Sequence, residues 1–249
     1  MAERIETLLR DRTDLSPYLV HFTRGGSNEE AKANLLSILD DEEIKAVSDF
    51  GMAKPFWEDE LTDEIKKQLR SEGFSQKVAC FTETPLEHCG MIVKDIQGRS
   101  CKFTSFGVVF DKNIARKKGV NPVWYLNTDT SGHFLTHSVD AMVKSCTDYV
   151  QKNEKIGDVP RFQALRLTPF LEQTDKITKD FSWEREWRCQ GGFVFRPDEV
   201  AAVFAPEHEH DDLRVRIAGL GAREWEKLEV LILDPSWTPA ELKKLVPRT

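Results

Sequence analysis

The order of secondary-structure patterns along the chain restricts its fold most. Helical patterns crowd the first part, whereas short β-branched or aromatic runs bounded by turn residues dominate the middle and the end. This segregation favours an α+β fold with a mixed or antiparallel sheet over a regular alternation of parallel units. The expected helices cover residues 28–40, 61–70 and 138–151 and a segment after Asp234, and the expected strands cover residues 77–81, 103–110, 122–126, 193–195, 200–205 and 228–233.

Two helix starts carry specific signals. Ser27 followed by Glu30 matches a capping box, in which side chains satisfy main-chain amides that have no partner within the helix. Thr238 followed by Pro239 places a capping hydroxyl before a proline, whose missing amide proton costs nothing in the first helical turn. The chain has 249 residues and neither internal repeats nor a linker-like stretch, so one domain over residues 1–249 is expected.

Charge and apolar content narrow the classes of partner. The formal net charge of −7 argues against broad attraction to nucleic acid, which requires a positive field, although a local basic groove stays compatible with it. The longest apolar stretch, 200–206, is far shorter than the roughly 20 residues of a membrane helix. Five cysteines without a CxxC pair predict free thiols in a reducing compartment. The N-terminal residues do not resemble a secretory signal, and a cytoplasmic location is expected.

Three parts of the sequence resemble familiar site motifs but do not establish them. The run 218–224 begins like a dinucleotide fingerprint but ends in Glu224, where a small residue must allow close packing. His133 and His137 have the spacing of zinc ligands on a helix, but no glutamate lies between them. The run 207–212 could hold a metal, yet an exposed acidic loop explains it equally well. We therefore predict no metal site.

The segment 19–26 is a candidate ligand-binding element. If it is a strand, alternate residues enter the core, and His21 and Thr23 share the opposite face. The pair Gly25 and Gly26 would let the main chain turn and approach a ligand before the capped helix begins. A structural histidine with satisfied hydrogen bonds explains His21 equally well.

The segment 179–189 combines tryptophans, arginines and glutamates. As a strand it would place Glu184, Glu186 and Arg188 on one face, whereas a helix would pair Glu184 with Arg188 at four-residue spacing. The Gly-Gly turn at 191–192 and the aromatic run 193–195 resemble a hairpin and favour the strand. An arginine in this setting could keep a neighbouring carboxylate ionised.

A third segment, 78–88, is an apolar strand that ends in hydroxyls, an acid and a proline. A strand-to-loop junction explains it, because a residue before proline is extended. In the functional interpretation, which is the weaker of the two, Thr82 and Glu83 lie at the mouth of a site.

These segments together resemble a known family. The runs His21–Arg24, Cys80–His88, Phe106–Lys112 and Trp183–Arg188 look like the AbiGi-like abortive phage infection family of bacteria. The resemblance covers most of the chain, roughly Tyr18 to Pro206. It implies a part in phage defence, either as the toxic component or as the antitoxin of a toxin–antitoxin pair.

A more distant resemblance concerns the DarT-like ADP-ribosyltransferase fold. It implies that His21, Thr23 and Arg24 bind NAD and that Glu186 is catalytic, with Glu184 as a competing candidate. Arg24 departs from the family pattern, in which the arginine lies further along the chain. A carboxylate that accepts a hydrogen bond from the ribose 2′-hydroxyl would stabilise the positive charge that develops as nicotinamide leaves.

The resemblances imply two classes of function. The first is an NAD-dependent ADP-ribosyltransferase of anti-phage defence, acting on a macromolecule such as nucleic acid. The alternative is a non-enzymatic antitoxin or defence regulator that binds a partner protein. A nuclease that uses His21 with Glu83 or Glu186 as acid and base fits the residue types but lacks a diagnostic spacing. The transferase requires that His21, Thr23 and Glu186 meet in one pocket.

Overall fold

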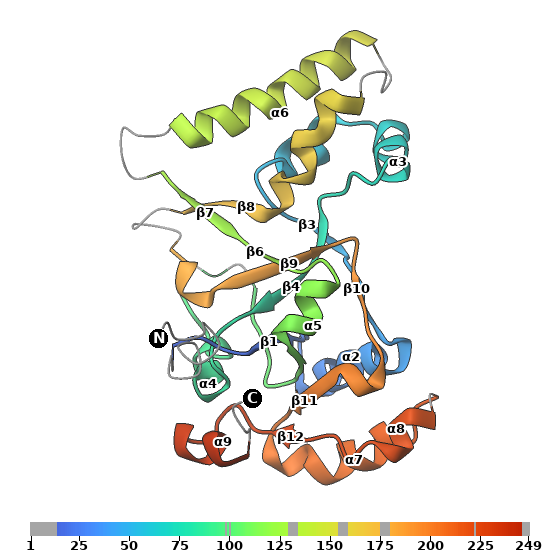
Figure 1. The fold of residues 1–249 in the computed structure, drawn as a ribbon, viewed down its shortest axis with the longest axis vertical. Coiled ribbons are helices and arrows are strands. Elements are labelled where there is room, and N and C mark those ends of the chain that lie inside the picture. The colour runs from blue at the N-terminus through green and yellow to red at the C-terminus, as the bar shows by residue number, and fades with distance from the viewer. Residues whose placement is uncertain are drawn as a thin grey trace, which may run out of the picture.

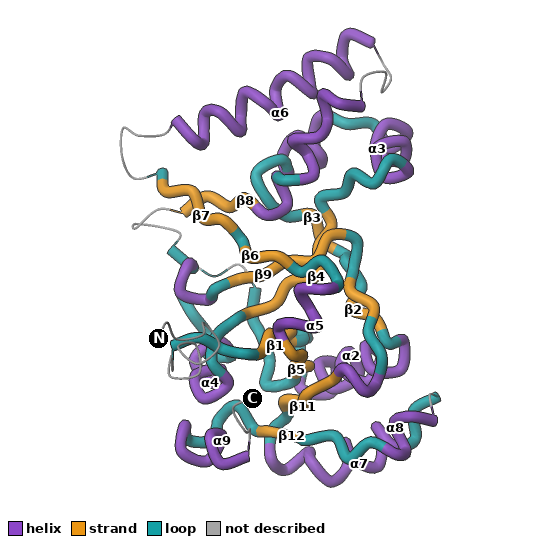
Figure 2. Tube along the Cα trace, in the orientation of Figure 1, coloured by secondary structure: helices purple, strands orange, loops and turns teal. Residues whose placement is uncertain are grey.

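A computed structural model describes residues 14–97, 99, 101–128, 134–153, 159–174, 180–221 and 223–245. Its strands lie between two groups of helices (Figures 1 and 2). One group, containing the long helix α6, lies above the sheet in the view, and the other, containing α7, α8 and α9, lies below it. This mixture of helices with a largely antiparallel sheet confirms the predicted α+β class.

The main sheet in the described residues has eight strands in the order β12-β11-β5-β1-β4-β9-β6, with β3 pairing to β4. Only β11 and β12 run parallel; the other pairs are antiparallel. Two small sheets, β10-β2 and the parallel pair β7-β8, lie beside it. The strands are β1 (Tyr18–Phe22), β2 (Glu43–Ile44), β3 (Ser48–Asp49), β4 (Lys77–Thr82), β5 (Gly107–Asp111), β6 (Asn121–Pro122), β7 (Trp124–Asn127), β8 (Leu171–Thr174), β9 (Glu186–Gln190), β10 (Phe193–Val194), β11 (Val200–Phe204) and β12 (Ile232–Leu233).

Short 3-10 and π turns connect many of the α-helices. Helix α2 begins as predicted, with the Ser27 hydroxyl accepting a hydrogen bond from the Glu30 amide at 3.2 Å. The α-helices are α2 (Asn28–Asp41), α3 (Asp63–Ser71), α4 (Cys89–Ile92), α5 (Lys112–Lys117), α6 (Phe134–Asn153), α7 (His210–Ala218), α8 (Arg223–Lys227) and α9 (Pro239–Leu245). The other helical turns are η1 (Phe56–Glu60), η2 (Leu86–His88), η3 (Val159–Arg166), η4 (Thr168–Phe170), η5 (Ser182–Glu184), η6 (Pro197–Glu199) and η7 (Glu207–Glu209).

Helices cover both faces of the main sheet, and side chains along its strands point alternately to one face and the other. Leu19 and Phe110 point to the face covered by α2 and α7, and Val20 and Phe22 point to the face covered by α4 and α9. The helices around α6 form a separate apolar core with η1, α3 and η3. The two faces of the main sheet and the helices around α6 therefore have separate apolar cores.

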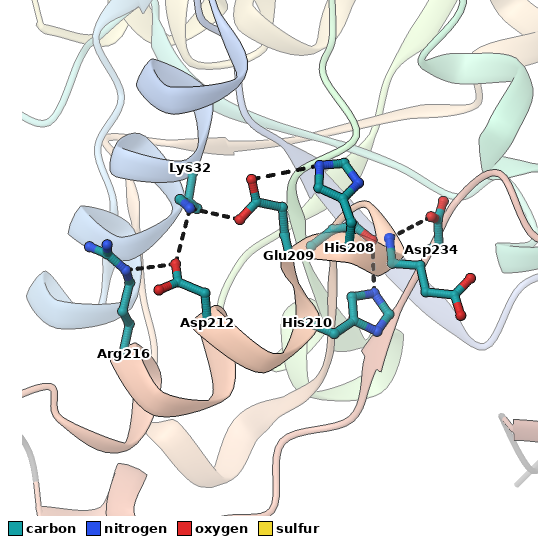
Figure 3. Close-up of polar contacts among 9 residues, drawn as sticks. Lys32, His208, Glu209, His210, Asp212, Arg216 and Asp234 are labelled. Carbon is teal, nitrogen blue, oxygen red and sulfur yellow. Dashed lines mark hydrogen bonds and ion pairs between the residues drawn. The ribbon is translucent and has the colours of Figure 1, made fainter.

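The acidic run 207–212, for which an exposed loop was one interpretation, forms η7 and the start of α7. Figure 3 shows Lys32 of α2 between Glu209 and Asp212, whose carboxylates accept hydrogen bonds from its ammonium group at 2.7 and 3.0 Å. His210 is buried, and its Nε2–H donates to the Ala205 carbonyl at 3.0 Å. These contacts join α7 to α2 and to the end of β11, so the run has a structural role.

The predicted hairpin at Gly191–Gly192 is wrong. Strand β10 pairs with β2, Phe193 lying opposite Ile44, and not with β9. The left-handed main chain at both glycines turns the chain away from the main sheet toward the end of α2. The predicted strand 103–110 begins only at Gly107, and α6 begins four residues before the predicted Ser138.

Candidate functional site

The main sheet is split at its centre. Strand β1 pairs with β5 over five residues and β4 pairs with β9 over five residues, but β1 and β4 share the single pair Val20 and Thr82. Beyond this pair the two strands separate. A cavity of about 810 Å³ lies at the split and is lined from both strands, from α2 and from the segment around Phe103. This volume is within the range of sites for small molecules.

Main-chain groups of two residues face the split. The Thr23 amide donates to Phe106 of the β5 side, so the alternate residue Phe22 directs its amide and carbonyl away from β5. The Glu83 amide donates to Arg185 on the β9 side, so Cys80 likewise directs its main chain away from β9. The Cys80 carbonyl accepts a hydrogen bond from the His21 ring, so the Phe22 peptide groups and the Cys80 amide are the ones that face the split for a ligand to bind.

His21 spans the split. Its Nδ1 lies 2.7 Å from the Cys80 carbonyl oxygen, which can only accept, so Nδ1 carries the proton and Nε2 is the acceptor nitrogen. Burial lowers the pKa of His21 to about 4, with the nearby Arg24 charge acting in the same direction and the Cys80 hydrogen bond opposing them. The imidazole is therefore neutral at physiological pH.

Stability should fall between pH 6.5 and pH 4 because of His21. Its pKa is lower in the folded protein than the ordinary 6.5, so in this window the unfolded chain binds a proton that the folded one does not. The contribution is fully present above pH 6.5 and is lost as the pH falls to about 4, with a slope of up to about 1.4 kcal/mol per pH unit. Urea unfolding at several pH values should show a shallower slope for His21→Gln; equal slopes would contradict it.

Thr23 and Arg24 both line the cavity, but they differ in availability. The Thr23 hydroxyl is buried and lies 3.2 Å from each of the Ala31 and Phe106 carbonyl oxygens, which fixes the turn into α2. Arg24 is exposed, and no carboxylate among the described residues forms an ion pair with it. Arg24 is thus the more available group for a ligand.

Glu186 lines the same cavity and is bound to Arg188. The two carboxylate oxygens accept from Nε and Nη2 of Arg188 at 2.8 and 2.9 Å. Arg188 is only 2% exposed and also donates to Glu172 at 3.0 Å and to the Pro169 carbonyl at 2.7 Å. It therefore links β9 to β8 and η4, and it fixes the orientation of the Glu186 carboxylate.

Glu184 has a second buried arginine as its partner. Nε and Nη2 of Arg99 lie 2.9 and 2.8 Å from one Glu184 oxygen. Burial raises the pKa of Glu184, and the charge of Arg99 opposes that shift. The chain passes from η5 to β9 through Arg185 in the left-handed region, at φ 50°, and both glutamates line the cavity. Such main-chain conformations are uncommon outside glycine and cluster at functional sites.

Thr82 and Glu83 have structural contacts. The Thr82 hydroxyl lies 2.5 Å from the Glu184 carbonyl, and Glu83 accepts from Lys112 and from the Trp187 indole. Thr82 lines the cavity, whereas Glu83 is not among the lining residues. The strand prediction for 179–189 holds from Glu186 onward, and residues 182–184 form the 3-10 turn η5.

Sequence patterns did not identify Arg99, Phe103 or Tyr125 as lining residues. Burial raises the pKa of Tyr125, as does the charge of Glu186, so its phenol stays protonated beside the carboxylate. Burial also raises the pKa of the Cys80 thiol, which makes it a poor nucleophile. The i, i+2 spacing of Glu186 and Arg188 was the available signal for their ion pair; loop residue Arg99 had none.

The chain belongs to the AbiGi family of abortive phage resistance proteins. A family model described as "Putative abortive phage resistance protein AbiGi, antitoxin" matches residues 60–213, which is more than half of the chain. The match confirms the resemblance to this family seen in the sequence. It includes Glu186 and Arg188 and begins after His21. No significant match was found among curated proteins or solved structures.

No helix in the described segments combines the length and the apolar character that crossing a membrane requires.

Proposed function

We propose that this chain is the antitoxin of an abortive-infection pair and that it acts by binding its toxin. The observation that carries the proposal is the family match, whose description names an antitoxin. The net charge of −7 suits long-range attraction to a basic partner. The partner is thus expected to be a protein with a positive surface.

The state of the two glutamates supports a binding function. Both oxygens of Glu186 accept hydrogen bonds from Arg188, and Glu184 is paired with Arg99. A carboxylate neutralised in this way is less able to stabilise a developing positive charge than a free one. An antitoxin requires the packing role of these pairs but not their chemistry.

Growth of a bacterial host tests this proposal. Expression of the chain alone should leave growth unchanged, and its co-expression with the product of the adjacent gene should rescue cells that this product arrests. Rescue by Glu186→Gln equal to that of the wild type would show that the carboxylate chemistry is dispensable. Growth arrest by the chain alone would contradict the antitoxin role.

A second candidate is NAD-dependent ADP-ribosyl transfer. The observation that favours it is that Glu186 lines the same cavity as His21, Thr23 and Arg24, although it lies far from them in the sequence. In this function, Arg24 and the neutral His21 would bind NAD, and Glu186 would accept the ribose 2′-hydroxyl hydrogen bond once Arg188 released one carboxylate oxygen. Nucleic acid or protein would be the acceptor of ADP-ribose.

Release of nicotinamide distinguishes this candidate from the first. An active transferase should release nicotinamide from NAD when DNA, RNA or protein is supplied, and Glu186→Gln should slow release by about 100-fold or more. Glu184→Gln is the matched control that separates the two glutamates. Thermal unfolding should confirm that both variants are folded. No release by the wild type with any acceptor would exclude this function.

A further inference from the structure

Four side chains stack alternately at the edge of the cavity. The Arg99 guanidinium lies 5.9 Å from the ring centre of Trp183 and 5.0 Å from that of Phe103. The Arg24 guanidinium lies 5.8 Å from the same Phe103 ring. Trp183, Arg99, Phe103 and Arg24 therefore form a ladder of alternating rings and cations, which we call the cation–π ladder.

Buried contacts hold the inner members of the ladder. Arg99 is 5% exposed and is fixed by Glu184 and by the Ile92 carbonyl, to which its Nη1 donates at 2.6 Å. Phe103 packs against the apolar core on the α4 side of the sheet. A surface fixed in this way loses little conformational entropy when a partner binds.

The two ends of the ladder are open to solvent. Trp183 is 39% exposed, although large aromatic side chains are mostly buried in folded proteins. Arg24 is exposed and has no carboxylate partner in the part of the chain that the structure describes. Tryptophan and arginine are the residues most enriched among those that dominate binding energy at protein interfaces.

We propose that the cation–π ladder is the docking surface for the partner protein and that the partner places a carboxylate against Arg24 and an aromatic ring against Trp183. The inference rests on the proposed antitoxin function and specifies where its partner binds. A carboxylate matches the exposed charge of Arg24, and the open face of Trp183 suits a ring. The Phe22 peptide groups and the Cys80 amide, which face the split, offer hydrogen bonds to an extended segment beside it.

Charge favours a protein over a nucleic acid on this surface. Acidic and basic side chains are equally numerous among the residues that line the cavity, and the whole chain is acidic. A polyanion requires several unpaired cations, whereas a single carboxylate is matched by Arg24 alone. The lining side chains that carry charge are Arg24, Asp41, Glu43, Lys45, Lys54, Arg99, Glu172, Glu184, Glu186 and Arg188.

Calorimetric titration with the purified product of the adjacent gene tests the docking surface. Trp183→Ala and Arg24→Gln should each weaken binding by about tenfold or more. Trp124→Ala is a matched control because Trp124 is 59% exposed on β7 and outside the ladder. Arg116→Gln is the matched control for the arginine, since Arg116 is exposed on α5. Both controls should bind within about twofold of the wild type.

The outcomes separate failure of this inference from failure of the proposed function. Unchanged affinity of the ladder variants, with wild-type rescue of growth intact, overturns the docking surface alone. Absence of binding by the wild type overturns the antitoxin proposal together with the surface. If Arg24→Gln weakens binding of NAD and leaves the affinity for the protein partner unchanged, the ladder is a nucleotide site and the inference is overturned.

Discussion

Replacement of Arg188 by methionine should lower the free energy of unfolding by about 3 kcal/mol or more. Methionine fills much of the same space but removes the donors to Glu186, Glu172 and the Pro169 carbonyl. It also removes the contact with the Phe50 ring, whose centre is 5.1 Å from the guanidinium. Glu186 and Glu172, both partly buried, then lose their contacts with the buried guanidinium, which is the main cost.

Chemical denaturation of matched variants measures this effect. Arg196→Met is the control, because Arg196 is exposed and its ion pair with Asp198 is screened by solvent, so that its loss should have little effect. The double variant of Arg188→Met with Glu186→Gln should be less destabilised than the sum of its single changes, since one unpaired charge is gone. Equal losses for Arg188→Met and Arg196→Met would contradict the proposed linking role.

Replacement of Phe110 by alanine should destabilise the fold by about 3–5 kcal/mol. Phe110 is fully buried in β5, and its ring lies 4.9 Å from that of Phe193 and 5.0 Å from that of Phe195. A third ring, that of Phe81, is 6.1 Å away. Removing the central ring leaves a cavity that these neighbours, held in β4 and in the segment 193–195, cannot fill.

Phe134 provides the comparison for this loss. It is 69% exposed on α6, so Phe134→Ala should change the free energy of unfolding by less than about 0.5 kcal/mol. Thermal and urea unfolding of both variants measure the difference directly. A loss below about 1 kcal/mol for Phe110→Ala would show that the aromatic cluster is less tightly packed than described.

Local patterns predicted local structure well. The capping signals of Ser27 and Thr238 locate the starts of α2 and α9, and the first apolar strand appears as β1. These signals depend on neighbours within four residues, so they act before the fold is complete. The α+β class follows from the same patterns.

Pairings between distant segments were harder to predict. The two glycines at 191–192 suggest a hairpin, but Phe193 has a better partner in Ile44, because this pairing brings its ring beside Phe110. The single pair between Val20 and Thr82 has no signal in either strand. Because that split creates the cavity, the cavity could not be predicted from the sequence. Several of the residues that line it were nevertheless identified as candidates.

The glutamates illustrate the limit of residue-type reasoning. The sequence indicated that an arginine holds a carboxylate ionised, and Arg188 does lie beside Glu186. It gave no indication that Arg99 pairs with Glu184, because 85 residues separate them. Only the three-dimensional arrangement therefore shows whether a carboxylate is free or paired.

We propose that the split between β1 and β4 is the functional site of this AbiGi protein. Amide hydrogen exchange, followed with and without the bound product of the adjacent gene, tests it most directly. Exchange should be slower at Phe22, Cys80 and Trp183 in the complex and unchanged along α6. Protection confined to α6, with exchange at the split unaltered, would contradict it.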